Sequence, residues 1–525
     1  MKDYTETIGF LGQWGRFQQI VFFSLIATIM PNGFGAFTLV FLTDTPSHHC
    51  LVSGINLTED WRKSVIPIRE VDGKQELSRC SRYRLDVVRN LSAQGYIPGM
   101  DVNLTDLEEE GCVDGWSYSK DIYESTIVSE FDLVCSNQWK QPFTSTVFFV
   151  GVLLGSFFSG QLSDRYGRKP ILFAALALQT VFTFAQVFSG SWIMFLIILF
   201  INGLGQMSNF VAALVLGSEV LTGKVRVLYS SLGTCLGFAI GYMILPLLAY
   251  FLRDWKSLSL ALSLPCVAYI PFWWLMPESP RWLLSQGRVE EAEAIIRTAA
   301  KWNKVQAPRI IFEDCGVKKM QTHSKEHYNM KKTLSFPFDF PRFTMIVGYY
   351  SLSFNTAQLH ENPYISCFIS AVVEIPAYIS SWLALLYLPR RLSVILTLVF
   401  GAVPLYLIQL VPDDLSNLSL ALEMLGKYSI TTGSSLMFAY TAELYPTVLR
   451  NTATGISNTV SRIGSCIAPL LLSLGMYYKY LPHIILGTLA VVAAFAALFL
   501  PESFKKPLPE TIEQMHRRES TKNKC

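Results

Sequence analysis

Long uncharged apolar runs recur along the chain, and short polar segments separate them. Four of these runs are FTSTVFFVGVLLGSFFSG, PILFAALALQTVFTFAQVF, WIMFLIILFINGLG and PHIILGTLAVVAAFAALFL. Each run approaches the ~20 apolar residues that a helix needs to cross the hydrocarbon core of a bilayer. The pattern therefore predicts an all-α membrane protein.

The same pattern, followed along the whole chain, predicts twelve transmembrane helices. They lie near 18–43, 142–162, 170–189, 192–216, 227–250, 257–276, 343–360, 364–388, 392–411, 418–442, 451–476 and 482–500. The segments outside the helices are an N-terminal stretch at 1–17, a long loop at 44–141, a second loop with short helices at 277–342, and a tail at 501–525.

Positive charge gives the expected orientation of these helices. Lys and Arg gather on the connections that follow even-numbered helices, and such clusters mark cytosolic loops. The first residues, MKDYTETIGF, do not resemble a signal peptide. We therefore expect both termini and the 277–342 loop to be cytosolic, and the 44–141 loop to be extracellular.

Composition fits this class and excludes others. Hydrophobic residues make up 51% of the 525 residues and the mean hydropathy is +0.34, which is more apolar surface than a soluble protein can hide. The net charge of +3 carries little information.

GSEVLTGKV is not a phosphate-binding loop, because five residues separate Gly217 from Gly223 and no strand precedes it. We expect no enzymatic chemistry, no metal site, no cofactor and no nucleic-acid partner.

The 44–141 loop carries two features of an extracellular segment. Sequons for N-glycosylation occur at Asn56, Asn90 and Asn103. An even number of cysteines, suited to two disulfides, occurs at Cys50, Cys80, Cys112 and Cys135. Their spacing does not give the pairing. The alternative, four free thiols in a cytosolic loop, does not account for the sequons.

An internal repeat divides the chain into two halves. Glu219 precedes Arg226 by seven residues, and Glu443 precedes Arg450 by seven, at an offset of 224. PES recurs at 277–279 and 501–503 at the same offset, and GRK at 167–169 is echoed two residues short of it by PRR at 389–391. Two parallel six-helix halves imply a pseudo-twofold axis along the membrane normal, with a site between the halves near the midplane.

Several motifs carry a family resemblance. GQLSDRYGRK at 160–169 resembles the signature between helices two and three of the major facilitator superfamily. With PESPRWLLSQGR and TAELYPTVLRN, it resembles the organic ion transporter family within that superfamily. FLGQWGRFQ, IMPNGF, CSRYRL, FFVGVLLGSF and RDWKSL resemble its carnitine and zwitterion branch. The resemblance implies a monomeric plasma-membrane carrier of small zwitterions or organic cations that works by alternating access.

The charges of GQLSDRYGRK are expected to form an inner gate. Asp164 can pair with Arg165, with Arg168 or with a helix end of the opposite half, and such contacts hold one conformation and break in the other. The network is expected to extend to Glu219, Arg226, Glu443 and Arg450. The alternative, that the basic residues only signal topology, leaves Asp164 and the glycines unexplained.

Ionisable residues inside helices are costly and mark candidate sites. Arg462 lies midway along the eleventh helix and can hold a substrate carboxylate, with a structural ion pair to a nearby Glu as the alternative. Glu374 and Lys427 are expected to pair with each other, and Glu423 shares the charge of Lys427. By resemblance, the remaining substrate-binding candidates are Phe438, Tyr440, Glu443, Phe238, Tyr349 and Asn209. Aromatic faces suit a quaternary ammonium.

The resemblance also suggests sodium coupling through Asn32, Gln179, Gln206 and Tyr440, whose neutral oxygens suit a hard cation. One feature departs from the family. Pro337, Asp339, Pro341 and Arg342 interrupt the start of the seventh helix, and leave about seventeen residues from Phe343 where ~20 are needed. This departure keeps open a transport-impaired or regulatory form of the carrier. The sequence also leaves open an organic anion exchanger and a channel.

Overall fold

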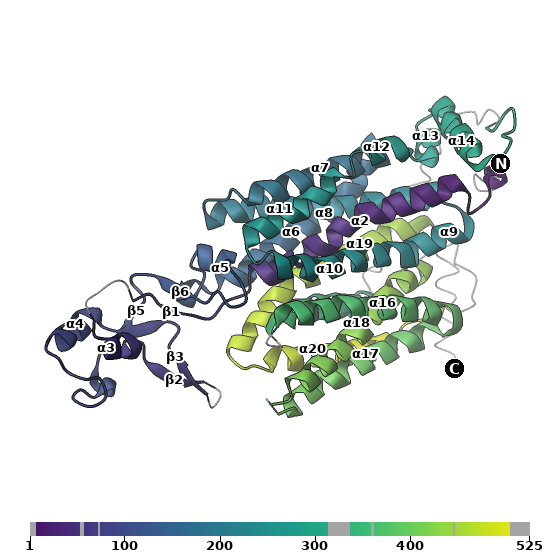
Figure 1. The fold of residues 1–525 in the computed structure, drawn as a ribbon. Helices are drawn as coiled ribbons and strands as arrows, with labels where there is room; N and C mark the ends of the chain where they lie inside the picture. The colour runs from purple at the N-terminus through teal and green to yellow at the C-terminus, as the bar shows by residue number, and fades with distance from the viewer. Residues whose placement is uncertain are drawn as a thin grey trace. The chain divides into compact units, whose positions relative to one another are not determined.

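The computed structural model describes residues 7–52, 57–71, 74–312, 336–358, 362–412, 414–444 and 447–503; within these, the side chains of 71, 74, 336–338, 357–358, 442–444 and 447–456 are not described. The chain forms two compact units. Unit 1 comprises Met1–Val40, Pro142–Phe251 and Lys256–Cys525, and unit 2 comprises Phe41–Gln141 and Leu252–Trp255. Figure 1 shows unit 1 as a bundle of long helices.

The first half of the bundle contains six helical passes. They are α2 (Arg16–Leu42), α6 (Lys140–Tyr166), α7 (Arg168–Gln186), α8 (Trp192–Val220), the continuous run α9 (Gly223–Leu228), η4 (Tyr229–Gly233) and α10 (Thr234–Phe251), and the pair α11 (Trp255–Val267) and α12 (Phe272–Leu275). Two shorter helices follow, α13 (Pro280–Ser285) and α14 (Val289–Asn303).

The second half contains six more passes. They are α15 (Phe336–Phe354) with the turn η6 (Asn355–Gln358), α16 (Pro363–Tyr387), α17 (Arg390–Leu407) with η7 (Ile408–Leu410), α18 (Ser416–Leu444), α19 (Thr447–Ser473) with η8 (Leu474–Met476), and α20 (Leu481–Ala497). Each of the twelve predicted helices overlaps one of these passes. Among the described residues, nine helices are long and apolar enough by themselves to cross a membrane.

The seventh predicted helix begins earlier than the sequence indicates. We expected it to start at Phe343, but α15 already begins at Phe336 and includes Pro337, Asp339, Pro341 and Arg342. Pro337 is compatible with this start, because the first N–H groups of a helix have no intrahelical partner in any case. The Arg342 guanidinium is buried, donates to the side-chain oxygen of Asn458 on α19, and lies 5.2 Å from the centre of the Phe438 ring on α18.

Glycines bring two helix backbones of the first half into direct contact. A Cβ atom at Gly33 on α2 would lie 2.1 Å from the carbonyl oxygen of Phe238 on α10, and one at Gly241 on α10 would lie 2.0 Å from that of Met30 on α2. Any larger residue at either position would push the helices apart. Small residues at helix contacts are typical of membrane bundles, where close backbone packing replaces hydrophobic burial.

Unit 2 contains three small antiparallel sheets. β1 (His48–Cys50) pairs with β6 (Trp116–Tyr118), β2 (Ile68–Val71) with β3 (Lys74–Leu77), and β4 (Ser81–Tyr83) with β5 (Glu109–Gly111). In register, Cys50 lies opposite Trp116 and Ser81 opposite Gly111. The helices are α3 (Glu59–Ser64), α4 (Leu85–Ala93), α5 (Ile127–Glu130), η2 (Leu104–Asp106) and η3 (Cys135–Asn137).

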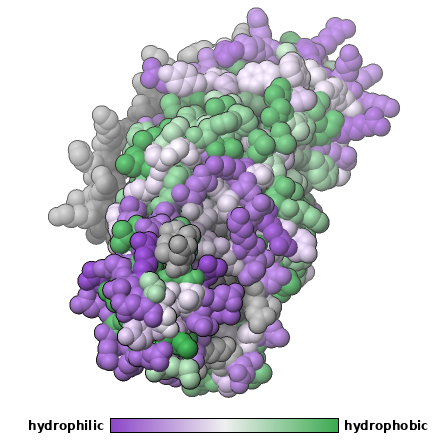
Figure 2. Space-filling model, turned by 60° about the vertical axis from the view of Figure 1, so that its left-hand side comes forward, coloured by the Kyte–Doolittle hydropathy of each residue, from purple (hydrophilic) through white to green (hydrophobic). Residues whose placement is uncertain are grey.

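Two disulfides and a small core stabilise unit 2. The pairing that the sequence left open is Cys50–Cys112 and Cys80–Cys135 in the structure. Trp61 is fully buried at the centre of an apolar cluster. Asn90 and Asn103 are exposed, and Asn56 lies outside the described residues. In Figure 2, the visible face of unit 2 is mostly hydrophilic. The helices of unit 1 carry a band of apolar residues.

Candidate functional site

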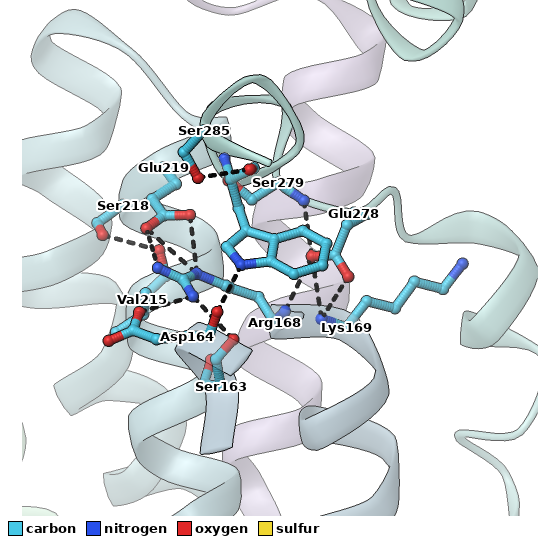
Figure 3. A network of polar contacts seen from close by, with 11 residues as sticks. Ser163, Asp164, Arg168, Lys169, Val215, Ser218, Glu219, Glu278, Ser279 and Ser285 are labelled. Carbon is cyan, nitrogen blue, oxygen red and sulfur yellow. Dashed lines mark hydrogen bonds and ion pairs between the residues drawn. The ribbon is translucent and has the colours of Figure 1, made fainter. Parts of the chain in front are cut away.

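Arg168 is the centre of a buried polar network where α6, α7 and α8 end or begin (Figure 3). Its Nε and Nη2 atoms donate to the Glu219 carboxylate at 3.0–3.3 Å, and its Nη1 atom lies 2.8 Å from Asp164 Oδ1 and 2.8 Å from the Ser163 carbonyl oxygen. The side chain of Arg168 is 10% exposed and that of Glu219 19%, whereas that of Asp164 is 73% exposed. The bond to Glu219 is therefore the shielded one, and the bond to Asp164 is open to water.

Glu278 binds the start of α7, the helix that carries Arg168. Its carboxylate accepts from the backbone N–H groups of Arg168, Lys169 and Ser279 at 2.8–3.2 Å, where the helix dipole of α7 favours a negative charge. Gly167 precedes α7 with a φ of 106°, a conformation that an L-residue rarely adopts. The GQLSDRYGRK motif therefore forms a tight turn, and Glu278 of the first PES motif caps the helix that follows it.

The sequence repeat corresponds to a repeated set of bonds. In the second half, the Glu502 carboxylate accepts from the backbone N–H groups of Arg390 and Arg391 at the start of α17, at 2.9 and 3.1 Å. Arg390 donates to the Leu385 carbonyl oxygen five residues before it, as Arg168 does to that of Ser163. The glutamate of each PES motif thus caps the start of a helix in its own half.

Not every predicted gate residue joins this network. The Arg165 guanidinium instead lies 5.5 Å from the centre of the Tyr166 ring. Among the described residues, Arg226 makes no salt bridge, and Glu219 pairs with Arg168. The side chains of Glu443 and Arg450 lie outside the described part of the chain. The contacts seen for Arg168 all come from the first half of the bundle.

Replacing Arg168 with Ala is expected to lower transport turnover about tenfold. The change leaves the half-buried Glu219 carboxylate without its cation. A buried donor or acceptor left unpaired costs about 1–3 kcal/mol. Surface abundance should stay near that of the parent. Uptake normalised to surface-biotinylated protein measures this, with Arg165→Ala as the neighbouring exposed control. Normal uptake by the Arg168 variant would show that the network has no part in gating.

A second polar group lies inside the bundle and joins α15, α16, α18 and α19. The Nζ atom of Lys427 lies 3.2 Å from Oε1 of Glu374, and both side chains are completely buried. The Tyr349 hydroxyl donates to the same carboxylate oxygen at 2.7 Å. The neighbouring ring of Tyr350 packs against Tyr349, and its hydroxyl accepts from Nη1 of Arg462 at 3.0 Å. Two adjacent tyrosines therefore connect Arg462 to the buried ion pair.

Aromatic residues of the first half complete this group. Phe37 on α2 stacks on Tyr242 of α10 with 4.1 Å between ring centres, and it lies 6.1 Å from both Tyr349 and Tyr350. The Lys427 ammonium lies 4.7 Å from the centre of the Tyr242 ring. The two halves of unit 1 thus meet around an aromatic surface that has one guanidinium and one ion pair at its border.

Arg462 has no carboxylate within salt-bridge distance among the residues that the structure describes, and its guanidinium is partly exposed. The alternative of a structural Glu partner therefore finds no support in the described part of the chain. A guanidinium whose described partner is one phenolic hydroxyl retains donors for a ligand carboxylate.

The other aromatic candidates lie in different surroundings. The Phe238 ring centre is 6.0 Å from that of Phe37, at the edge of the aromatic surface. Phe438 lies beside Arg342 instead, and the buried Tyr440 donates its hydroxyl to the Pro501 carbonyl oxygen. Within the described part of the chain, the contacts of these two residues are with α15 and with the end of the second half, away from the partner of Arg462.

Phe37, Tyr242 and Tyr350 form most of the aromatic surface, but no motif in the sequence singles them out. The chain has 35 Phe and 23 Tyr residues, most of them in apolar runs, so the type of residue alone does not distinguish a member of this group from any other packed aromatic residue. The sequence offered one usable signal, the YY pair at 349–350. Two adjacent residues of a helix point to different faces, so such a pair can contact two different groups.

Four amides form a third polar group between α2, α7 and α8. Gln206 donates to the Asn32 carbonyl oxygen at 2.7 Å, Gln179 to that of Pro31 at 3.3 Å, and Asn209 to that of Thr28 at 2.9 Å. All these side chains are buried. The side-chain oxygens of Gln179, Gln206 and Asn209 have no hydrogen-bond donor among the described residues. Tyr440 is on α18 and shows no contact with this group.

Comparison with known proteins identifies the fold. Residues 114–515 match the family described as Sugar (and other) transporter. A structure of the xylose transporter XylE from E. coli in a partially occluded inward-open conformation matches with a TM-score of 0.58 at 14% identity, and covers 91% of this chain and 98% of that one. A XylE structure that also matches is described as a major facilitator superfamily symporter. The predicted fold class is thereby confirmed.

Curated relatives match over nearly the whole length. The organic cation/carnitine transporter 2 of Rattus norvegicus is 50% identical over 528 residues, which cover 98% of this chain and 94% of that protein. The solute carrier family 22 member 4 of Mus musculus is 49% identical over 526 residues, covering 98% and 95%. The chain has the major facilitator superfamily fold, belongs to the Sugar (and other) transporter family, within the branch of the organic cation/carnitine transporters, and is a multi-pass membrane transporter rather than an enzyme.

Proposed function

We propose that this protein carries carnitine-like zwitterions and organic cations across the plasma membrane by alternating access, as a monomer with both termini in the cytosol. The names of the relatives support this substrate class. The observation that carries the proposal is the position of Arg462, which borders an aromatic surface formed by Phe37, Tyr242, Tyr349 and Tyr350.

The chemistry of this surface matches a small zwitterion. A quaternary ammonium has no proton to donate, so aromatic faces are its best partners. A carboxylate at the other end of the same molecule suits the guanidinium of Arg462, which offers paired N–H donors. A simple cation such as tetraethylammonium needs only the aromatic part. The arrangement therefore accounts for a carrier that accepts both classes.

Unit 2 supports the proposed orientation. Disulfides persist in oxidising compartments, and this unit contains two. Asn90 and Asn103 are exposed and thus accessible to glycosylation. Unit 2 is proposed to be extracellular, which puts the network of Arg168 and Glu278 on the cytosolic side, because each helical pass reverses the direction of the chain.

We propose that sodium is the coupling ion and that it binds at the amide group of Asn32, Gln179, Gln206 and Asn209. Three side-chain oxygens there are buried without donors, and a buried acceptor without a partner is costly unless a cation or a water occupies it. The group is next to α10, which presents Tyr242 and Phe238 to the aromatic surface. Sodium binding and substrate binding therefore share α2, against which α10 packs closely.

Uptake of labelled carnitine, ergothioneine and tetraethylammonium into cells, with and without sodium, tests the function. We expect saturable carnitine uptake that falls when choline replaces sodium. Gln206→Leu should remove this sodium dependence, whereas Gln186→Leu, a buried glutamine outside the group, should retain it. Uptake of none of the three compounds by protein at the surface would support the transport-impaired alternative, and unitary currents would indicate a channel.

A further inference from the structure

The Lys427 ammonium lies against the aromatic surface that is proposed to bind the substrate cation. Its Nζ atom is 4.7 Å from the centre of the Tyr242 ring, 5.6 Å from that of Tyr349 and 6.0 Å from that of Phe37. A cation within about 6 Å of a ring centre is attracted by the face of the ring. Three of the four rings that form this surface therefore already contact a cation of the protein itself.

Lys427 reaches these rings across the boundary between the two halves. It belongs to α18, where the Glu374 carboxylate and the Ser370 carbonyl oxygen, both on α16 of the second half, lie 3.2 and 3.1 Å from its Nζ atom. Phe37 on α2 and Tyr242 on α10 belong to the first half, and both are completely buried. When the halves rock apart as rigid bundles, the ion pair stays intact and the contacts with these two rings break.

A substrate ammonium competes with Lys427 for the same rings. Both groups carry one positive charge, and repulsion between like charges is strong where water does not reach. A quaternary ammonium therefore contacts Phe37 and Tyr242 only after Lys427 has withdrawn from them. In the empty carrier, Lys427 takes the place of the missing cation, so the two halves close on each other as they do around a substrate.

We propose that Lys427 is an internal substitute for the substrate cation, which binds the aromatic surface in the empty carrier and is displaced by the substrate. This inference rests on the proposed function and deepens it, because it assigns a competitor to the same site. Lys427 then weakens the binding of quaternary ammonium compounds. It also allows the empty carrier to return across the membrane with no substrate on the opposite side.

The binding test uses the double variant Lys427→Met/Glu374→Gln. The variant removes the ammonium together with its buried partner, so the net charge is unchanged and no unpaired charge remains. We expect the purified full-length variant to bind tetraethylammonium about tenfold more tightly than the parent, because the rings are vacant. The rise of Tm over a concentration series of tetraethylammonium measures this affinity. A purely structural ion pair predicts weaker binding, because its loss loosens the site.

Two further variants support this comparison. Lys301→Met, an exposed lysine of α14, should leave the affinity for tetraethylammonium unchanged. Lys427→Gln/Glu374→Gln keeps a donor for the Ser370 carbonyl oxygen and is measured in parallel, so that the test does not depend on the folding of one variant.

The transport test compares exchange with net uptake. Proteoliposomes are loaded with unlabelled tetraethylammonium or with buffer alone, and the uptake of labelled tetraethylammonium is followed with the membrane potential held near zero. The parent should take up the compound at similar rates under both conditions, because it returns empty. In the double variant, the ratio of exchange to net uptake should rise about tenfold, because empty return leaves the rings without a cation.

The outcomes separate this inference from the proposed function. Unchanged or weaker binding by a double variant with the Tm of the parent overturns the inference, and so does an unchanged ratio of exchange to net uptake. If the double variant binds tetraethylammonium more tightly than the parent but neither protein transports any of the three test compounds, the proposed function is wrong and the competition at the rings stands.

Discussion

Arg462→Ala is expected to reduce the uptake of carnitine while leaving that of tetraethylammonium close to the parent. The guanidinium is the group on the aromatic surface that suits a carboxylate, and tetraethylammonium has none. Hydrogen bonds to charged groups contribute about 1.5–3 kcal/mol, so carnitine uptake at low concentration should fall about 10- to 100-fold. Initial rates for both compounds, divided by surface abundance, measure the ratio.

Two further variants separate charge from geometry at this position. Arg462→Lys retains the charge but not the paired N–H donors, and should recover only part of the carnitine uptake. Tyr350→Phe removes the hydroxyl that accepts from Arg462 at 3.0 Å, and should lower carnitine uptake less than Arg462→Ala does. Equal carnitine uptake by Arg462→Ala and the parent would show that the guanidinium does not hold the carboxylate.

The helices and the repeat were predictable because each depends on residues close together in sequence. A membrane helix needs a continuous apolar run, which is visible in the sequence itself. The repeat is visible because the two PES motifs keep the same spacing from Glu219 and Glu443 in their respective halves. The capping of α7 by Glu278 and of α17 by Glu502 gives that repeat its physical reason. A motif that caps a helix tolerates little change in position.

Most contacts between distant residues were not predictable, although the expected pairing of Glu374 with Lys427 is confirmed. Arg165 and Arg168 are three residues apart in one motif, yet only Arg168 reaches Glu219, because the start of α7 directs its side chain toward α8. His483 Nε2 lies 3.1 Å from Glu423 Oε2, but the two residues are 60 positions apart, and nothing in either local sequence indicates the other. For the second half, the sequence indicated Glu374 and Lys427 as a pair, with Arg462 and Tyr349 as separate candidates. It did not indicate Tyr350, which lies between Arg462 and Tyr349.

Lys427→Met is expected to have the largest effect on stability. It leaves the Glu374 carboxylate completely buried, with the Tyr349 hydroxyl at 2.7 Å and the Tyr378 hydroxyl at 3.4 Å as its partners. Removing one member of a buried ion pair costs about 3–5 kcal/mol, a large part of the stability of most folded proteins. Thermal unfolding of the purified protein and its abundance at the cell surface should both decrease strongly. Lys301→Met, an exposed lysine of α14, is the matched control.

The reverse change is expected to be milder. Glu374→Gln leaves the Lys427 ammonium with acceptors on Ser370 and with the Tyr242 ring at 4.7 Å, so its charge keeps part of its stabilisation. The double variant Lys427→Met/Glu374→Gln removes both charges, and should unfold at a higher temperature than Lys427→Met alone. If Lys427→Met were as stable as the parent, the Glu374 carboxylate would have to be protonated or hydrated, and the ion pair would not stabilise the fold.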